Sequence, residues 1–184
     1  MKATGIVRRI DDLGRVVIPK EIRRTMRIRE GDPLEIYTDR EGEVIFKKYS
    51  PIGELSAFAA QYADTLHKTC QMAVVICDRD AVIASAGVSR KEYLDRKVSA
   101  ELESIIENRS LYTHKADGEK ISVIDDGGSH YISCAMPIIT EGDVIGCVCS
   151  VINSNDTGEG KISDELEVKL VQTASGFLGK QLES

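Results

Sequence analysis

The sequence lacks any hydrophobic stretch long enough to cross a membrane. None of its apolar runs approaches the roughly 20 residues that a membrane-spanning helix needs. Its first residues, MKATGIVRRIDD, are interrupted by charge and contain no apolar core of a signal peptide. Because 42% of the 184 residues are hydrophobic and 29% are charged, the composition is that of a globular protein. We therefore expect a cytoplasmic protein with one large domain or two small ones.

The sequence also lacks the even set of cysteines that a disulfide framework requires. Its cysteines are scattered and mostly lie inside apolar runs, which predicts reduced, buried thiols. They are Cys70, Cys77, Cys134, Cys147 and Cys149. Cys147 and Cys149 share one face of a predicted strand, but no second pair accompanies them as a zinc site would require. Redox sensing stays open, because it depends on an exposed thiol with a perturbed pKa.

Patterns typical of catalysis or metal binding are missing as well. The three histidines, His67, His114 and His130, lie far apart and do not have the spacing of metal ligands. No nucleophile elbow, P-loop or zinc-protease helix is present. We therefore expect a protein that is not an enzyme, with no catalytic residues, no metal and no cofactor.

Charge, by contrast, is distributed very unevenly along the chain. Residues 1–50 carry 12 Lys and Arg against 9 Asp and Glu, a net charge of +3. The remaining residues carry 12 basic and 21 acidic groups, a net charge of −9. Residues 1–29 alone carry nine basic and three acidic groups, a net charge of +6. A concentrated basic segment on an acidic protein indicates a polyanionic partner, with a solvated charged surface as the alternative.

The basic segment has the pattern of short strands around one short helix. Turn residues and β-branched runs predict strands over residues 4–10, 15–18, 34–38 and 43–48. Pro19 suits the first turn of a helix over residues 20–27, and Gly31, Asp32 and Pro33 end that helix. Residues 39–42 predict the turn of a hairpin, with Gly42 supplying the required backbone freedom.

The predicted helix presents one basic stripe. Four basic residues fall at positions i, i+3, i+4 and i+7, and they are Lys20, Arg23, Arg24 and Arg27. Ile22 and Met26 form an apolar pair on roughly the opposite side. The helix can therefore bury one side and present positive charge on the other, which favours polyanion binding.

Fifty residues are few for an independent hydrophobic core. Small chains bury too little of their surface, and this region has no disulfide or metal site to compensate. A second copy of the chain can supply the missing core, so we expect residues 1–50 to form a dimer.

Residues 54–184 predict an α+β domain, which begins after a joint at residues 51–53 where Pro51 and Gly53 break regular structure. Apolar runs predict strands over residues 72–77, 81–86, 121–124, 130–139 and 144–152. Amphipathic helices are predicted over residues 54–66, 99–108 and 163–182. The apolar faces of the first and last helices can cover the sheet, meet another subunit, or both.

The segment GIVRRIDDLGRVVIPKEIRRTMRIREGDPLEIYTDREGEVIFKKY resembles the DNA-binding domain of the AbrB family of bacterial transition-state regulators. The resemblance is continuous and includes the GRVVIP segment and the paired arginines. It implies a swapped-hairpin β-barrel, in which two chains interleave their strands and bury Val16, Val17 and Ile18. The remainder resembles a GAF domain, mainly at SPIGEL and TASGFLGKQLE, which implies an antiparallel sheet with flanking helices.

The AbrB resemblance implies four DNA-contacting arginines in each chain, and these are Arg8, Arg15, Arg23 and Arg24. Adjacent residues of a strand point to opposite faces, and the family pattern favours Arg8, so Arg9 is expected to be a bystander. Lys2, Lys20 and Arg27 are weaker candidates that contribute electrostatically.

The GAF resemblance implies a pocket between the sheet and covering segments in residues 87–120. Polar candidates near its mouth are Ser85, Ser89, Arg90 and Tyr93. The alternative is that these side chains only satisfy local backbone groups, and that the pocket is packed.

Together, the two resemblances imply a nucleoid-associated regulator of sporulation genes that activates some and represses others. Its partners would be double-stranded DNA and itself, as a dimer through residues 1–50 and a tetramer through the GAF-like domains. A small-molecule effector would be a further partner, and a membrane would not. The alternative is an antitoxin-like module that uses the same barrel to bind a protein.

Overall fold

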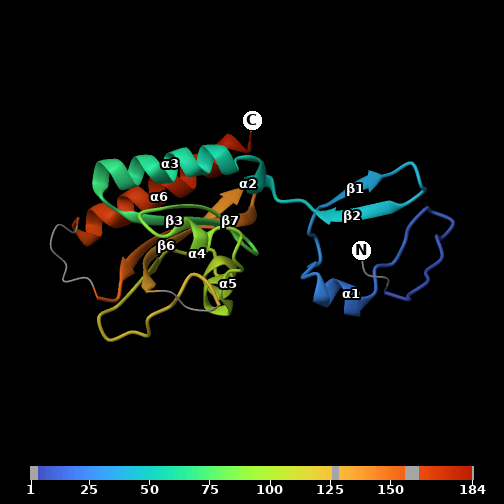
Figure 1. Ribbon diagram of the computed structural model, residues 1–184, viewed down its shortest axis with the longest axis horizontal. Coiled ribbons are helices and arrows are strands. Elements are labelled where there is room, and N and C mark those ends of the chain that lie inside the picture. The colour runs from blue at the N-terminus through green and yellow to red at the C-terminus, as the bar shows by residue number, and fades with distance from the viewer. Residues whose placement is uncertain (1–3, 126–128, 156–161, 184) are drawn as a thin grey trace. The chain divides into compact units, whose positions relative to one another are not determined.

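The computed structural model describes residues 4–125, 129–155 and 162–183, and its chain divides into two compact units (Figure 1). The N-terminal unit is Met1–Tyr49, and the C-terminal unit is Ser50–Ser184. Within the described residues, no helix combines the length and apolar character that crossing a bilayer would require.

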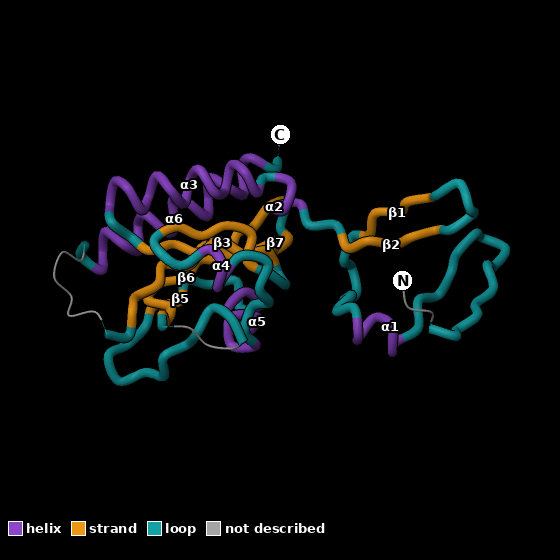
Figure 2. Tube along the Cα trace, in the orientation of Figure 1, coloured by secondary structure: helices purple, strands orange, loops and turns teal. Residues whose placement is uncertain are grey.

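The N-terminal unit contains one short helix and one hairpin (Figure 2). Helix α1 spans Lys20–Thr25, and strands β1 (Leu34–Thr38) and β2 (Val44–Lys48) pair antiparallel. Gly42 has a φ of 85°, the left-handed backbone that glycine adopts without strain, so the predicted hairpin is confirmed. Pro19 is the N-cap of α1 rather than its first helical residue.

The predicted strands over residues 4–10 and 15–18 are wrong for the single chain, since neither segment belongs to a strand. The chain reverses between them, where the amide of Gly14 donates to the carbonyl of Asp11 over 3.0 Å. A strand exists only where its backbone groups pair with a neighbouring strand. These two segments pair with no strand of the described chain.

The N-terminal unit has no hydrophobic core of its own. Among residues 4–49 only Pro19 is buried, and no residue of α1 is buried. Val17 is 72% exposed although it belongs to an apolar run, and Leu13 is 70% exposed. The expected burial of Val16 and Val17 is therefore absent from the single chain, because that burial was predicted to come from a second copy.

The C-terminal unit is built on one antiparallel sheet with the strand order β4-β3-β7-β6-β5. The strands are β3 (Ala73–Asp78), β4 (Val82–Ala86), β5 (Tyr112–Thr113), β6 (His130–Thr140) and β7 (Asp143–Asn153). The helices are α2 (Pro51–Glu54), α3 (Ser56–Cys70), α4 (Arg90–Tyr93), α5 (Ala100–Glu107) and α6 (Asp164–Gln181).

Helices cover both faces of this sheet, so its strands are apolar on both sides (Figure 1). Along β3, Val74 and Ile76 pack into the core under α3 and α6, whereas Val75 and Cys77 pack into the core under α4 and α5. A strand buried on both faces reads as a continuous apolar run, which is why the sequence located β3, β4, β6 and β7.

The terminal helices α3 and α6 lie side by side on one face. Their buried residues are Ala59, Ala63 and Leu66 from α3, and Val171, Ala174 and Leu178 from α6, among others. Gly179 brings α6 very close to β6, since an added Cβ would lie 2.4 Å from the carbonyl oxygen of Ile139. Of the roles that the sequence left open for these helices, covering the sheet is therefore observed.

Two further predictions in this unit are wrong. Residues 121–124 form no strand, and only Ile124 makes an isolated bridge, with Val98. Residues 51–53 are not a break but part of α2, since proline is accepted at the start of a helix and Ser50 Oγ accepts a hydrogen bond from Gly53 N. Ile52 is fully buried in the core under α3 and α6.

Candidate nucleic-acid interface and sensor site

The candidate DNA-contacting arginines of the N-terminal unit differ in exposure. Arg8 and Arg24 are exposed, and 70% of the Arg15 side chain is open to solvent. Arg23 is half-buried, and its Nε is buried without a hydrogen-bond partner in the described chain. Guanidinium groups at such positions can make two-point contacts with phosphates or guanine edges. Lys2 lies outside the described residues.

Arg15 is held by the carboxylate of Asp11. Asp11 Oδ1 accepts hydrogen bonds from the backbone amides of Leu13 (3.0 Å) and Arg15 (2.7 Å). Asp11 Oδ2 accepts a hydrogen bond from Arg15 Nε over 2.8 Å. The bonds from the Arg15 amide and side chain lower the pKa of Asp11 below its ordinary value. Sequence reasoning missed the contact of Asp11 with Arg15, because an aspartate shortly before a glycine predicts a turn but not which side chain its carboxylate engages.

The basic stripe predicted on the helix is shorter than expected. Helix α1 ends at Thr25, and Arg27 follows it with a φ of 53°. The amide of Ile28 donates to the carbonyl of Arg23 over 2.8 Å, as in a Schellman-type helix end. Arg27 therefore occupies the left-handed position that usually holds glycine and does not continue the stripe. Exposed Lys20 remains on α1 with the paired arginines.

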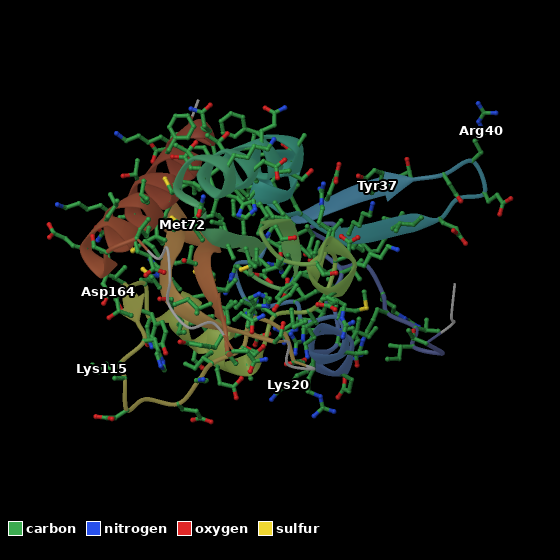
Figure 3. All side chains as sticks on the ribbon, turned by 60° about the vertical axis from the view of Figure 1, so that its left-hand side comes forward. Lys20, Tyr37, Arg40, Met72, Lys115 and Asp164 are labelled. Atoms are coloured by element: carbon green, nitrogen blue, oxygen red, sulfur yellow. The ribbon has the colours of Figure 1, made fainter. Side chains whose placement is uncertain are left out.

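The segment after α1 is tied to the hairpin. Lys48 Nζ on β2 donates to the carbonyl of Arg27 over 2.9 Å. It also lies 3.8 Å from Asp32 Oδ2, which accepts a hydrogen bond from the amide of Arg29 over 2.7 Å. These contacts fix where α1 ends relative to β2, and so help to fix the place of Arg23 and Arg24. At the hairpin tip, by contrast, the side chain of Arg40 points into solvent (Figure 3).

The four candidate ligand residues do not form one cluster. Ser85 and Tyr93 are buried in the C-terminal unit, and neither Ser85 Oγ nor Tyr93 Oη has a hydrogen-bond partner in the described chain. Burial raises the pKa of Tyr93 above its ordinary value. The ring of His130 packs edge-on against the ring of Tyr93, with 6.2 Å between the ring centroids. Ser89 and Arg90 are instead exposed, at the start of α4. Only the first two lie in the interior of the C-terminal unit.

The cysteines are free thiols, and four of the five are buried, as predicted. Cys149 Sγ lies 3.8 Å from Cys147 Sγ. Burial raises the pKa of Cys134 to about 12 and raises that of Cys147. Thiols this hard to ionise are poor nucleophiles. Among the described residues, no group of His, Cys, Asp or Glu could hold a metal ion.

The chain thus combines an arginine-bearing unit, in which residues 4–49 have no core of their own, with a helix-covered antiparallel sheet. The C-terminal unit matches the family model described as "Stage V sporulation protein T C-terminal, transcription factor" over residues 54–183. The chain is also 53% identical to stage V sporulation protein T of Bacillus subtilis (strain 168), with 100% of this chain and 99% of that protein aligned. The chain therefore belongs to the stage V sporulation protein T family, and the predicted function of a sporulation transcription regulator is confirmed.

Other comparisons concern the separate units. Residues 7–53 match a family model described as "Antidote-toxin recognition MazE, bacterial antitoxin". The solution structure of the N-domain of the transcription factor AbrB is 65% identical, covering 27% of this chain and 92% of that one, with a TM-score of 0.25. The structure of the cofactor-binding GAF domain of the nutrient sensor CodY from Clostridium difficile is 15% identical. The match covers 67% of this chain and 83% of that one, with a TM-score of 0.43. The predicted α+β class is confirmed by the helices and the antiparallel sheet of the structure itself.

Proposed function

We propose that the chain binds double-stranded DNA as an intertwined dimer, through Arg8, Arg15, Arg23 and Arg24 of each N-terminal unit. The observation that carries this proposal is the combination of exposed arginines, at Arg8, Arg15 and Arg24, with a core-free unit in which Pro19 is the only buried residue among residues 4–49. The N-domain structures of AbrB, which is itself called a transcription factor, support the same partner.

The dimer follows from the apolar surface that one chain leaves exposed. Large hydrophobic side chains are 36% or more exposed at Ile6, Val7, Ile10, Leu13, Val16, Val17, Met26, Ile36, Tyr37, Val44, Ile45, Phe46 and Tyr49. A soluble unit does not retain so much apolar surface, and covering it stabilises the association by roughly 25 cal/mol per Å². In the dimer, residues 4–10 and 15–18 would gain the strand partners that the single chain does not offer.

The arginines set the expected strength of the electrostatic attraction. Two chains would contribute at most eight guanidinium groups, so the logarithm of affinity should fall with the logarithm of salt concentration at a slope no steeper than about −7. Lys20 and Arg27 add weaker, longer-range attraction. Because α1 is too short to traverse a major groove, we expect loose sequence preference and some reading of DNA shape.

The C-terminal units would join dimers into a tetramer and respond to an effector. Phe177 on α6 is 39% exposed, and its ring packs 5.7 Å from that of Phe58 and 5.6 Å from that of Tyr62, both on α3. This aromatic surface on the paired helices is suited to a second copy. The buried hydroxyls of Ser85 and Tyr93 would give an enclosed small molecule its hydrogen bonds. Such a regulator would act on the nucleoid in the cytoplasm and would not be an enzyme.

A test compares DNA binding by the full-length protein and by Arg23→Ala/Arg24→Ala. Both would be titrated with a labelled AT-rich duplex over a series of salt concentrations, after matching for fold and oligomeric size. We expect the double variant to lose affinity and to flatten the salt slope by up to about 3 to 4, because a dimer loses up to four phosphate contacts. A control, Lys91→Ala/Lys115→Ala, removes the same charge from exposed sites of the C-terminal unit and should change little.

Equal binding by wild type and the arginine variant, or no binding by either, would refute the DNA interface. The antitoxin-type family match would then favour an N-terminal unit that binds a protein. Co-purification of a small partner with the wild-type chain would support that second function.

A further inference from the structure

We propose that Asp11 is a positioning residue that holds Arg15 in the orientation required for DNA binding. This inference rests on the proposed function, because it assumes that Arg15 reaches DNA. It assigns a role to a carboxylate within the most basic part of the chain, where negative charge would otherwise oppose binding.

The contacts of Asp11 fix both ends of Arg15. Oδ1 accepts from the backbone amide of Arg15 at 2.7 Å, while Oδ2 accepts from its side-chain Nε at 2.8 Å. The backbone amide of Asp11 donates in turn to the carbonyl of Arg15 over 3.1 Å. One aspartate therefore restrains the main chain and the guanidinium of the same arginine.

The geometry of the guanidinium explains how this would help binding. Its five N–H groups form a planar fork, and a carboxylate that engages Nε leaves N–H groups on the two Nη atoms for a second partner. The Arg15 side chain is 70% exposed, so its outer end is accessible to a phosphate or a guanine edge. A side chain restrained before binding also loses less conformational entropy on binding.

Simple electrostatics predicts the opposite effect for removal of this charge. A carboxylate near the phosphate backbone is repelled by it, so a bystander aspartate should weaken binding and its neutralisation should strengthen binding. If Asp11 positions Arg15, neutralisation should weaken binding instead. The sign of the change therefore separates the two roles.

Asp11→Asn is the informative substitution. Its amide oxygen can still accept from the backbone amides of Leu13 and Arg15, so the turn is kept. Its side-chain amide group is a donor and cannot accept from Arg15 Nε, so the ion pair is lost. Asp11→Ser offers a second variant, because a hydroxyl can preserve the turn without the charge.

The experiment measures duplex affinity and salt slope for full-length wild type, Asp11→Asn, Arg15→Ala and the double variant, all matched for thermal stability and oligomeric size. Asp12→Asn is the control, because it removes the same charge from the adjacent exposed residue. We expect Asp11→Asn to weaken duplex affinity by about 2- to 10-fold and to flatten the salt slope. The reason is that Arg15 loses the exposed ion pair that orients it. Asp12→Asn should bind equally well or slightly more tightly.

The double variant locates the effect. With Arg15 already replaced by Ala, Asp11→Asn should not weaken binding further, because its effect runs through Arg15. The proposal is overturned if Asp11→Asn binds as tightly as wild type or more tightly. It is also overturned if Asp11→Asn weakens the Arg15→Ala protein by the same factor. If the wild-type protein does not bind DNA, both this proposal and the proposed function fail. If wild type binds and Arg15→Ala binds equally well, this proposal fails because Arg15 has no role, but the proposed function stands.

Discussion

At the scale of single residues, close approach and exposure determine which side chains matter. Position 179 requires a glycine, because α6 lies directly against the backbone of β6 at this point. Arg15 is accessible but restrained, and Ser85 is enclosed but unsatisfied. These properties depend on contacts between segments distant in sequence or on local turns, so residue type alone does not reveal them.

Replacing Gly179 with alanine should destabilise the C-terminal unit. The new Cβ would lie 2.4 Å from the Ile139 carbonyl oxygen, so α6 must shift away from β6, at a cost of about 1–3 kcal/mol as for other overpacked sites. Gly176 lies on the same helix with nothing within 4 Å of an added Cβ. Gly176→Ala should therefore stabilise by up to about 1 kcal/mol through helix propensity. Urea unfolding of both variants would test this, and equal effects would contradict the packing of α6.

At the scale of elements, pairing and burial decide which apolar runs become strands. Residues 72–77 and 144–152 were predicted as strands and form β3 and β7, because each has neighbours on both edges of the sheet. Residues 121–124 are equally apolar and bury Val123 and Ile124, yet they form no ladder. Apolar pattern predicts burial, whereas a strand also needs a partner. This is also why residues 4–10 and 15–18, which pair with no strand of their own chain, were misassigned.

The candidate sites were predictable to different degrees. Charge pattern and family resemblance indicated Arg23 and Arg24, of which Arg24 is exposed and Arg23 is half-buried, a difference that the pattern does not show. The helix end was not predictable, since it depends on a left-handed backbone at Arg27, a residue that rarely adopts it. Nor could the sequence separate buried Tyr93 from exposed Arg90, because both lie in one four-residue helix and only its contact with the sheet distinguishes them.

Ser99 joins two elements and should be sensitive to substitution. Its Oγ accepts from Leu102 N over 3.1 Å as the N-cap of α5 and donates to the carbonyl of Ser122 over 2.7 Å. Ser99→Ala should cost about 1–3 kcal/mol, because it removes the cap and leaves a carbonyl without its donor. Ser104→Ala is the control, since that exposed hydroxyl donates only within α5. Thermal unfolding should shift much more for the first variant than for the second; similar shifts would argue against the linking role.

At the scale of the whole molecule, the two units obtain their stability differently. The C-terminal unit encloses two hydrophobic cores, one on each face of its sheet. Within residues 4–49, the N-terminal unit buries only Pro19. A regulator built in this way would couple folding of its DNA-binding unit to association, so that DNA affinity depends on protein concentration.

A charge placed on the apolar surface of the hairpin should separate these two sources of stability. Phe46 on β2 is 41% exposed and lies opposite Ile36 in the register of the hairpin. If this surface is buried between copies, Phe46→Glu places an unpaired carboxylate in the dimer core, and dimerisation through the N-terminal units should weaken at least tenfold. Sedimentation velocity would report smaller species, and DNA binding would be lost.

The melting transition of the C-terminal unit should persist, because its cores contain no residue of the hairpin. Ser104→Glu adds the same charge to an exposed site on α5, which packs on the opposite face of the sheet from α3 and α6, and should leave assembly unchanged. Unchanged assembly and DNA binding in Phe46→Glu would mean that the hairpin surface faces solvent, and the intertwined dimer would have to be abandoned.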